Sequence, residues 1–422
     1  MSTTPPLGRE LLRQIIEDES TMRCRVYLAP CGIGLGHAGR LITIAKNLRD
    51  RGASCFFSTY GDAVQFVKAH NFPVAGMPAI RYVETADGSP DFVKTTIRPM
   101  AHISALFKQI CREIQLIKYV NPDIIVSDSR PSTVIASWLL GRPCLLILQQ
   151  LKILIPHQTK LSKVRRIFKK LLEYGLVAVL SLLWLRCKKI YVPDFPNPLT
   201  IAKSQVHVYS SFYNRVEFIG PVIDITPEVR VYDSSDLSIK RSYDLDNRPL
   251  IFCGLSGTPK EKIIIAEKLK DIFQSFPNSI QVFMTVGSKN FKPIIRENVK
   301  IYGWVEKRTP LYKMSDIVIH RGGHNTTSEC IYFGKNMIII PAPAHTEKMD
   351  NARSINMLGL GLVISQSHVS KKVLLNAINK ILETSSFKNR AIAIREQALK
   401  FNAVQTIIKH IFEFVGILPE LK

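Results

Sequence analysis

Glycine-rich turns follow three short apolar segments and carry the residue types best suited to bind an anion and to move a proton. The first turn, residues 31–40, has the sequence CGIGLGHAGR. Its glycines let backbone N–H groups approach a ligand, and the helix that follows supplies partial positive charge for a phosphate or a developing anion. The imidazole of His37 can take a proton from a hydroxyl group near neutral pH. The turn therefore predicts an anion site with His37 as a candidate general base; a structural histidine that caps the turn is the alternative.

Gly34, Gly36 and Gly39 of this turn also fit the G-x-G-x-x-G pattern of dinucleotide-binding proteins. Such a site needs an acidic residue at the end of the next strand, about 20 residues on, to hold the ribose. Here that strand ends in Phe-Phe-Ser-Thr, and the first carboxylate is Asp62 in the following turn. The spacing therefore disfavours a dinucleotide site.

The two other turns lie in the second half of the chain. Residues 253–258, CGLSGT, offer donors suited to a pyrophosphate, although alone they are equally compatible with a plain tight turn. Residues 320–329, HRGGHNTTSE, follow a strand, and their Gly-Gly pair lets phosphates approach the main chain. Glu329 can accept hydrogen bonds from ribose hydroxyls, although a glutamate early in a helix is also a common partner of the helix dipole.

Alternating apolar segments and longer helical periods must position these turns. Apolar, often β-branched segments predict strands at 24–30, 53–59, 121–129 and 142–148, and again from 188, 216, 248, 279, 299, 316 and 337. Helical periods lie between them, as at 39–51 and from Asp62. This alternation is typical of parallel sheets, so the sequence predicts an α/β protein with two doubly wound halves joined near Pro221.

Taken together, these motifs resemble the GT-B glycosyltransferases of family 28, which include the peptidoglycan lipid-intermediate N-acetylglucosaminyltransferase. More distant similarity extends to UDP-glucuronosyltransferases and to the second GlcNAc transferase of the dolichol pathway. The resemblance covers residues 24 to about 390. Its most specific part is GGHNTTSE at 322–329 with E-x-x-x-N-A at 347–352, supported by GLGHAGR at 34–40, PDFPNP at 193–198 and FIGPV at 218–222.

The resemblance implies two Rossmann-like domains that face a central cleft. We expect an N-terminal tail at 1–22, an acceptor-binding domain at 23–221, a UDP-sugar-binding domain at 222–390 and a C-terminal helical tail at 391–422. The implied reaction is inverting transfer of a hexose, GlcNAc by preference, from a UDP-sugar to a polyprenyl or dolichyl pyrophosphate-linked acceptor. A different UDP-hexose with a glycolipid or diacylglycerol acceptor, or a nucleotide-sugar 2-epimerase of the same architecture, is the alternative.

The resemblance also assigns roles to individual residues. His37 is the base, with Asp128 at the end of its strand as a second candidate, and the acceptor or phosphate loop contains Gly34, Gly36 and Arg40. Many relatives have an acidic residue followed by Gln where this chain has Glu347-Lys348, which leaves the sugar open. The donor-binding residues are Gly254, Ser256, Gly257, Thr258, Arg321, Gly322, Gly323, His324, Asn325, Thr326, Thr327, Glu329, Glu347 and Lys348.

No cofactor or metal is expected, because such enzymes use a helix dipole and backbone donors to stabilise the departing UDP. Asp244-Leu245-Asp246 has the letters of a D-x-D motif, but it lies in a polar linker just before a strand. The eight cysteines are scattered, mostly within apolar segments, and predict reduced core thiols in a cytosolic compartment. The polar N-terminus lacks the pattern of a signal peptide.

The formal net charge of +23 predicts an anionic partner. We find no nucleic-acid-binding module, so nucleic acid is not expected. Segment 160–189 instead places cationic residues on both sides of the apolar stretch 171–185, which suits an anionic membrane surface. As a helix this stretch measures about 22 Å, short of the roughly 30 Å hydrocarbon core, so peripheral or monotopic attachment at the cytoplasmic face is expected. A buried helical hairpin and a true transmembrane helix are the alternatives.

Overall fold

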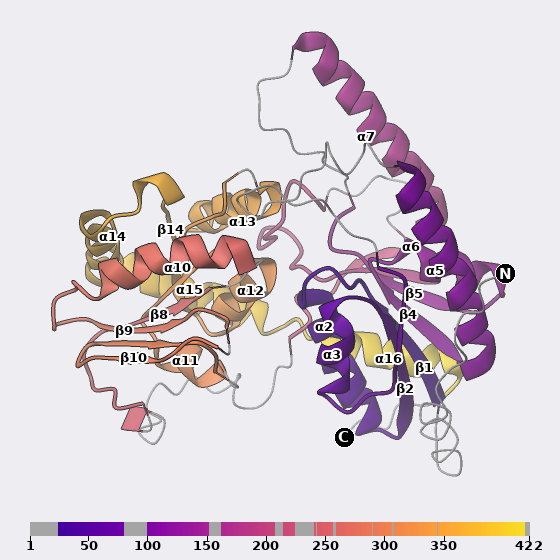
Figure 1. The fold of residues 1–422 in the computed structure, drawn as a ribbon, viewed down its shortest axis with the longest axis horizontal. Helices are drawn as coiled ribbons and strands as arrows, with labels where there is room; N and C mark the ends of the chain where they lie inside the picture. The colour runs from indigo at the N-terminus through magenta and orange to yellow at the C-terminus, as the bar shows by residue number, and fades with distance from the viewer. Residues whose placement is uncertain are drawn as a thin grey trace.

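The computed structural model describes residues 24–79, 99–151, 162–206, 214–223, 240–241, 243–255, 259–288, 290–305, 308–343 and 345–417. The chain forms two lobes, each built on a seven-stranded sheet with helices on both faces (Figure 1). Both lobes are doubly wound, as the alternating pattern predicts. None of the helices in the described part of the chain is long and apolar enough to cross a membrane.

The first sheet is parallel throughout, with the order β3-β2-β1-β4-β5-β6-β7. Its strands are β1 (Cys24–Pro30), β2 (Ala53–Thr59), β3 (Val74–Gly76), β4 (Ile124–Asp128), β5 (Cys144–Ile147), β6 (Lys189–Val192) and β7 (Val216–Phe218). The helices between them are α2 (Gly36–Arg49), α3 (Asp62–Lys68), α5 (Pro99–Val120), α6 (Pro131–Leu139) and α7 (Lys163–Trp184). The central strands are buried on both faces, which explains their nearly continuous apolar sequences.

The second sheet has the order β10-β11-β9-β8-β12-β13-β14, and only the pairing of β10 with β11 is antiparallel. Its strands are β8 (Leu250–Gly254), β9 (Gln281–Thr285), β10 (Ile294–Ile295), β11 (Val299–Tyr302), β12 (Ile317–His320), β13 (Asn336–Ile339) and β14 (Gly361–Val363). The helices are α10 (Pro259–Phe273), α11 (Thr309–Met314), α12 (His324–Tyr332), α13 (Thr346–Met357), α14 (Lys371–Glu383) and α15 (Ser385–Ala398), with a short 3-10 helix at Gln366–His368.

The strand order reverses between β1 and β4 in the first sheet and between β8 and β12 in the second. Ligands of open parallel sheets bind outside the carboxyl ends of strands at such a reversal. The turn that contains His37 follows β1, Asp128 ends β4, Gly254 ends β8 and His320 ends β12. Topology alone therefore gathers the predicted turns at the two reversal points.

The structure differs from the sequence prediction at several elements. Helix α2 begins at Gly36, so His37 lies in its first turn and not in the loop before it. The long helix α5 and the short strands β3, β10 and β14 were not predicted, because strands of two or three residues carry too little periodicity to be recognised.

The last helix, α16 (Ala403–Val415), returns to the first lobe (Figure 1). Its buried side chains join the core under α2 and β1, and include Val404, Ile407, Ile408 and Ile411. His410 Nδ1 lies 2.9 Å from the Tyr191 hydroxyl at the end of β6. Helix α15 instead packs in the core of the second lobe. The end of the chain therefore completes the first lobe and ties the two lobes together.

Truncation of Ile411 to Ala should lower the free energy of unfolding by about 2–5 kcal/mol, because it leaves a cavity in the core of the first lobe. Phe414→Ala on the same helix is the matched control, because this side chain is 45% exposed. Urea unfolding followed by circular dichroism measures both. Equal losses for the two variants would contradict the docking of α16 on the first lobe.

Candidate active site

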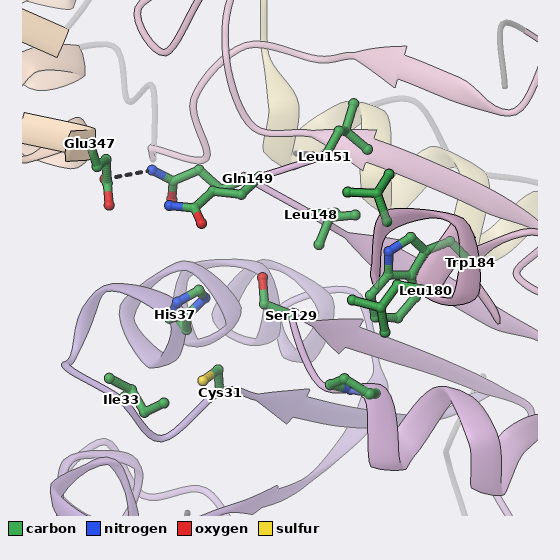
Figure 2. A pocket seen from close by; sticks show the side chains of 13 residues that line it. Cys31, Ile33, His37, Ser129, Leu148, Gln149, Leu151, Leu180, Trp184 and Glu347 are labelled. Carbon is green, nitrogen blue, oxygen red and sulfur yellow. Dashed lines mark hydrogen bonds between the residues drawn. The ribbon is translucent and has the colours of Figure 1, made fainter. Parts of the chain in front are cut away.

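The glycine-rich turns of the two lobes face each other. A Cβ placed on Gly36 would lie 3.4 Å from the side-chain nitrogen of Asn325 at the start of α12. Nearby, Gln149 of the first lobe donates from Nε2 to Oε1 of Glu347 in α13 over 3.0 Å (Figure 2). The turn after β1 thus lies against the start of α12, and Ile33 and Gln149 border one cleft with Glu347 of α13.

His37 and Asp128 form a hydrogen-bonded pair at the carboxyl end of the first sheet. His37 Nδ1 lies 2.8 Å from Asp128 Oδ1. The His37 side chain is 23% exposed, whereas Asp128 has no exposed surface. Asp128, our second candidate for the base, therefore lies behind His37 and away from the cavity.

The charge state of Asp128 determines which nitrogen of His37 carries the proton. Arg40 Nη2, which can only donate, lies 2.9 Å from His37 Nδ1 and 3.0 Å from Asp128 Oδ1, and its hydrogen bond goes to the carboxylate. An unprotonated Nδ1 would direct its lone pair at an ionised carboxylate oxygen, which is repulsive. The proton therefore belongs on Nδ1, donated to Asp128, and the lone pair of Nε2 is left to accept a proton.

Arg40 keeps Asp128 ionised. Its Nε and Nη2 donate to the two carboxylate oxygens over 3.0 Å each. Burial by itself raises the pKa of Asp128, but the charge of Arg40 and the hydrogen bonds from His37 and Arg40 outweigh it and hold that pKa well below its ordinary value. The guanidinium of Arg40, which we grouped with the acceptor or phosphate loop, is thus turned inward and only 3% exposed.

Gln149 connects this cluster to the second lobe. Arg40 Nη1 donates to Gln149 Oε1 over 2.8 Å, which fixes the orientation of the amide. The amide nitrogen then faces Glu347. A continuous set of hydrogen bonds therefore runs from the His37–Asp128 pair to Glu347, a carboxylate that the resemblance to family 28 assigns to donor binding.

A strained turn at Ser129 positions Asp128, and a buried ion pair next to it holds the turn in place. Ser129 has a φ of 58°, which is unusual for a residue other than glycine, and its hydroxyl donates to Asp128 Oδ1. The next residue, Arg130, is buried and paired with the buried Glu113 of α5. Glu113 also accepts hydrogen bonds from Tyr27 and Ser58. This buried network fixes the chain on both sides of Asp128.

A cavity of about 380 Å³ opens in front of His37 (Figure 2). Its polar end contains His37, Gln149 and Glu347. Its other end is apolar and is formed by Leu148 and by Val177, Leu180 and Trp184 of α7. The cavity therefore has one end suited to hydroxyl groups and one suited to hydrocarbon.

In the second lobe, the turn after β12 packs directly on α13. Gly322 has a φ of 77°, and a Cβ there would lie 2.8 Å from the carbonyl oxygen of Lys348. The side chain of Asn351 donates to the carbonyl of Gly322 over 2.9 Å. Only glycine fits this position, so the N-terminus of α12 and the start of α13 are held together.

The structure places the other predicted donor residues in two groups. Gly254 ends β8, Gly323 precedes α12, and Asn325 and Glu329 are partly exposed. By contrast Arg321, His324, Thr326 and Thr327 are buried, and the Thr327 hydroxyl donates to the Gly323 carbonyl. Ser256, Gly257 and Thr258 lie outside the described residues.

Two side chains of the second lobe hold the Glu329 carboxylate. The Tyr312 hydroxyl donates to Glu329 Oε2 over 2.7 Å, and Arg308 Nη2 lies 3.6 Å from Oε1. Farther away, Asp244 pairs with Lys300, and Asp246 pairs with Arg248. Both aspartates of the D-x-D sequence thus form ion pairs within the second lobe.

Sequence reasoning missed Gln149, Ser129 and Glu113. Gln149 had a visible signal, because it is the first polar residue after the buried segment 142–148. Glu113 had none, because a glutamate within an amphipathic helix is indistinguishable from a solvated one until the fold buries it.

Residues 250–411 match the glycosyltransferase family 28 C-terminal domain. Over 405 residues the chain is 24% identical to an uncharacterized glycosyltransferase of Methanosarcina acetivorans, covering 93% of this chain and 99% of the relative. It is 30% identical over 211 residues to the UDP-N-acetylglucosamine--N-acetylmuramyl-(pentapeptide) pyrophosphoryl-undecaprenol N-acetylglucosamine transferase of Thermosipho africanus, covering 47% of this chain and 59% of that enzyme. The crystal structure of the kitacinnamycin glycosyltransferase is similar with a TM-score of 0.66 at 15% identity, covering 94% and 99% of the two chains.

Two doubly wound lobes facing a cleft, with these relatives, define a glycosyltransferase with the GT-B fold. The match to the glycosyltransferase family 28 C-terminal domain covers most of the second lobe and extends into α16. The predicted fold class and the resemblance to family 28 are thereby confirmed.

The buried side chain of His320, which ends β12, should make the free energy of unfolding depend on pH in the acid range. Burial lowers the pKa of His320 to about 3, so it is neutral in the folded protein, while the unfolded chain binds a proton below about pH 6.5. Its contribution to stability is complete above that pH and is lost as the pH falls. From pH 7.5 to 5.0 this one group should lower the free energy of unfolding by about 2 kcal/mol.

His320→Asn removes this titration, because the Asn side chain does not ionise. The Asn amide oxygen can still accept the hydrogen bond from Gly322 N that His320 Nδ1 accepts. Urea unfolding at the two pH values should show a pH dependence smaller by about 2 kcal/mol in the variant. An unchanged pH dependence would show that His320 is not buried in its neutral form.

Proposed function

We propose that this glycosyltransferase moves a sugar, with GlcNAc as the first candidate, from a UDP-sugar to a lipid-linked acceptor with inversion of configuration. One observation carries the proposal: His37, oriented by a buried carboxylate, opens on a cavity whose polar end also contains Glu347 of the other lobe. The relative from Thermosipho africanus, whose name specifies UDP-N-acetylglucosamine and a pyrophosphoryl-undecaprenol acceptor, supports this choice of substrates.

The second lobe would hold the donor. The N-terminus of α12, after Gly322 and Gly323, offers backbone N–H groups and partial positive charge to the pyrophosphate. Glu329, whose carboxylate is held by Tyr312, would accept hydrogen bonds from the ribose. Glu347 would bind hydroxyls of the sugar, since its carboxylate lies at the cavity.

The first lobe would hold the acceptor, and the reaction is a direct displacement. His37 Nε2 takes the proton of the acceptor hydroxyl as its oxygen forms a bond to the anomeric carbon. The bond from that carbon to the diphosphate oxygen breaks on the opposite face, and UDP leaves toward α12. Asp128 orients His37 and stabilises the imidazolium that forms, as carboxylates do in other histidine-based sites.

Helix α7 supports the assignment to the cytoplasmic face of a membrane. It projects from the first lobe, with its N-terminal end farthest from the sheet (Figure 1). That end exposes large apolar side chains at Val164, Ile167, Phe168 and Leu171, all more than 60% exposed. Exposed Arg166 and Lys170 lie among them. This combination suits an anionic headgroup layer and peripheral attachment.

The direct test is incubation of the purified protein with a panel of UDP-sugars and polyprenyl pyrophosphate-linked acceptors, followed by the mass of the lipid product. Gain of one N-acetylhexosamine mass on the lipid supports the proposal. Epimerised UDP-sugar without an acceptor product would indicate a 2-epimerase instead. Transfer to diacylglycerol alone would show that the acceptor is diacylglycerol and not a pyrophosphate-linked lipid.

His37→Ala should lower turnover by about 10²–10⁴, because the acceptor proton then has no positioned base, while the affinity for the UDP-sugar changes little. Initial rates and equilibrium binding of the donor measure the two effects. His70→Ala, outside the cavity, is the control. Equal loss of donor binding and turnover in His37→Ala would indicate a structural histidine.

A further inference from the structure

We infer that the apolar end of the cavity is a subsite for hydrocarbon of the acceptor, so that an alkyl chain lies against α7 while the reacting hydroxyl lies at His37. This inference rests on the proposed function and names the part of the acceptor that the first lobe recognises. It concerns the inner face of α7, which is separate from the projecting end assigned to the membrane.

The inner face of α7 follows from helical spacing. Val177, Leu180 and Trp184 are three and four residues apart, so they lie on one face of the helix, and all three line the cavity. Val177 and Trp184 are 8% and 7% exposed. Leu182, between them in sequence, is 68% exposed and belongs to another face. The helix therefore presents a continuous apolar wall to the cavity.

The opposite wall is held in place by the first sheet. Leu148 directly follows β5, and its backbone N–H donates to the carbonyl of Tyr191 in β6 over 2.9 Å. Leu151 lines the cavity nearby, and its N–H donates to the carbonyl of Gln205 over 3.0 Å. These backbone bonds fix both leucines opposite α7, so the apolar end is preformed.

The cavity changes from polar to apolar along its length. In Figure 2 the polar side chains of His37, Gln149 and Glu347 lie on one side, where Cys31 and Ile33 also line the cavity; Leu180 and Trp184 lie on the other side, and Ser129 lies between. An acceptor that fills the whole cavity must be polar where the proton leaves and apolar beyond it. Leu176, one turn before Leu180 and 41% exposed, continues the apolar face toward the projecting end of α7. This gives a longer chain a path out of the cavity.

A series of n-alkyl N-acetylglucosaminides with two to ten carbons tests the subsite through acceptor KM. Each methylene that leaves water is worth about 0.8 kcal/mol, so KM should fall about fourfold per methylene until the apolar end is full, and then level off. Leu180→Gln should raise the KM of the longer members by about 5- to 30-fold and leave the donor KM unchanged. Leu182→Gln is the matched control and should change neither.

A binding measurement keeps the inference testable without sugar transfer. In a Trp138→Phe/Trp304→Phe protein, Trp184 is the remaining tryptophan. Dodecyl maltoside brominated in its alkyl chain, used below its critical micelle concentration, should quench Trp184 emission saturably. Leu180→Gln should weaken this saturation and Leu182→Gln should not.

The outcomes separate the two proposals. Saturable quenching in a protein that transfers no sugar would overturn the proposed function and keep the subsite. Sugar transfer with a KM independent of chain length, without quenching of Trp184, would overturn the subsite alone. Equal effects of Leu180→Gln and Leu182→Gln would also overturn it, because they would show a general response of α7.

Discussion

The buried carboxylate of Asp128 is the group on which the site depends. It has no exposed surface, and it binds Arg40 through both oxygens and His37 through one. An unpaired charge at this depth would be costly, so the position of Arg40 in α2 and that of Asp128 at the end of β4 are mutually fixed. The same arrangement favours the proton of His37 on Nδ1 and leaves the lone pair on Nε2, in a side chain that lines the cavity. The orientation of His37, the base in our proposal, is thus a consequence of how the first lobe avoids an unpaired buried charge.

Contacts between the lobes extend this constraint. Arg40 also holds Gln149, and Gln149 reaches Glu347 of α13. In the second lobe, the close packing of Gly322 on Lys348 holds the start of α12 beside the start of α13. Helix α16 then secures the end of the chain to the first lobe. The groups assigned to acceptor and donor are therefore connected both through side chains at the cleft and through the course of the chain.

Helix α7 has apolar side chains in two different environments, one set facing the cavity and the other exposed at its projecting end. Its cavity-facing residues complete the apolar end of the cavity, and its projecting end exposes apolar and cationic side chains. The hydrophobic effect favours burial of both sets, but only the first set is covered within the chain. The exposed set is the feature of α7 that supports our proposal of attachment at a membrane surface.

The sequence by itself determined the two doubly wound lobes, because buried parallel strands must be short apolar segments and helices must separate them. The sequence also identified the glycine-rich turns as candidate anion sites and His37 as a candidate base, because these predictions depend only on residue types and their spacing. Only the tertiary structure decided the partners: that Arg40 turns inward to Asp128, that Gln149 meets Glu347 and that Glu113 lies beneath the Ser129 turn. Arg40 and Asp128 are 88 residues apart, Gln149 and Glu347 are 198 apart, and Glu113 and its partner Arg130 are 17 apart. No local sequence pattern encodes which of these residues meet. Burial and charge pairing across packed elements made that choice.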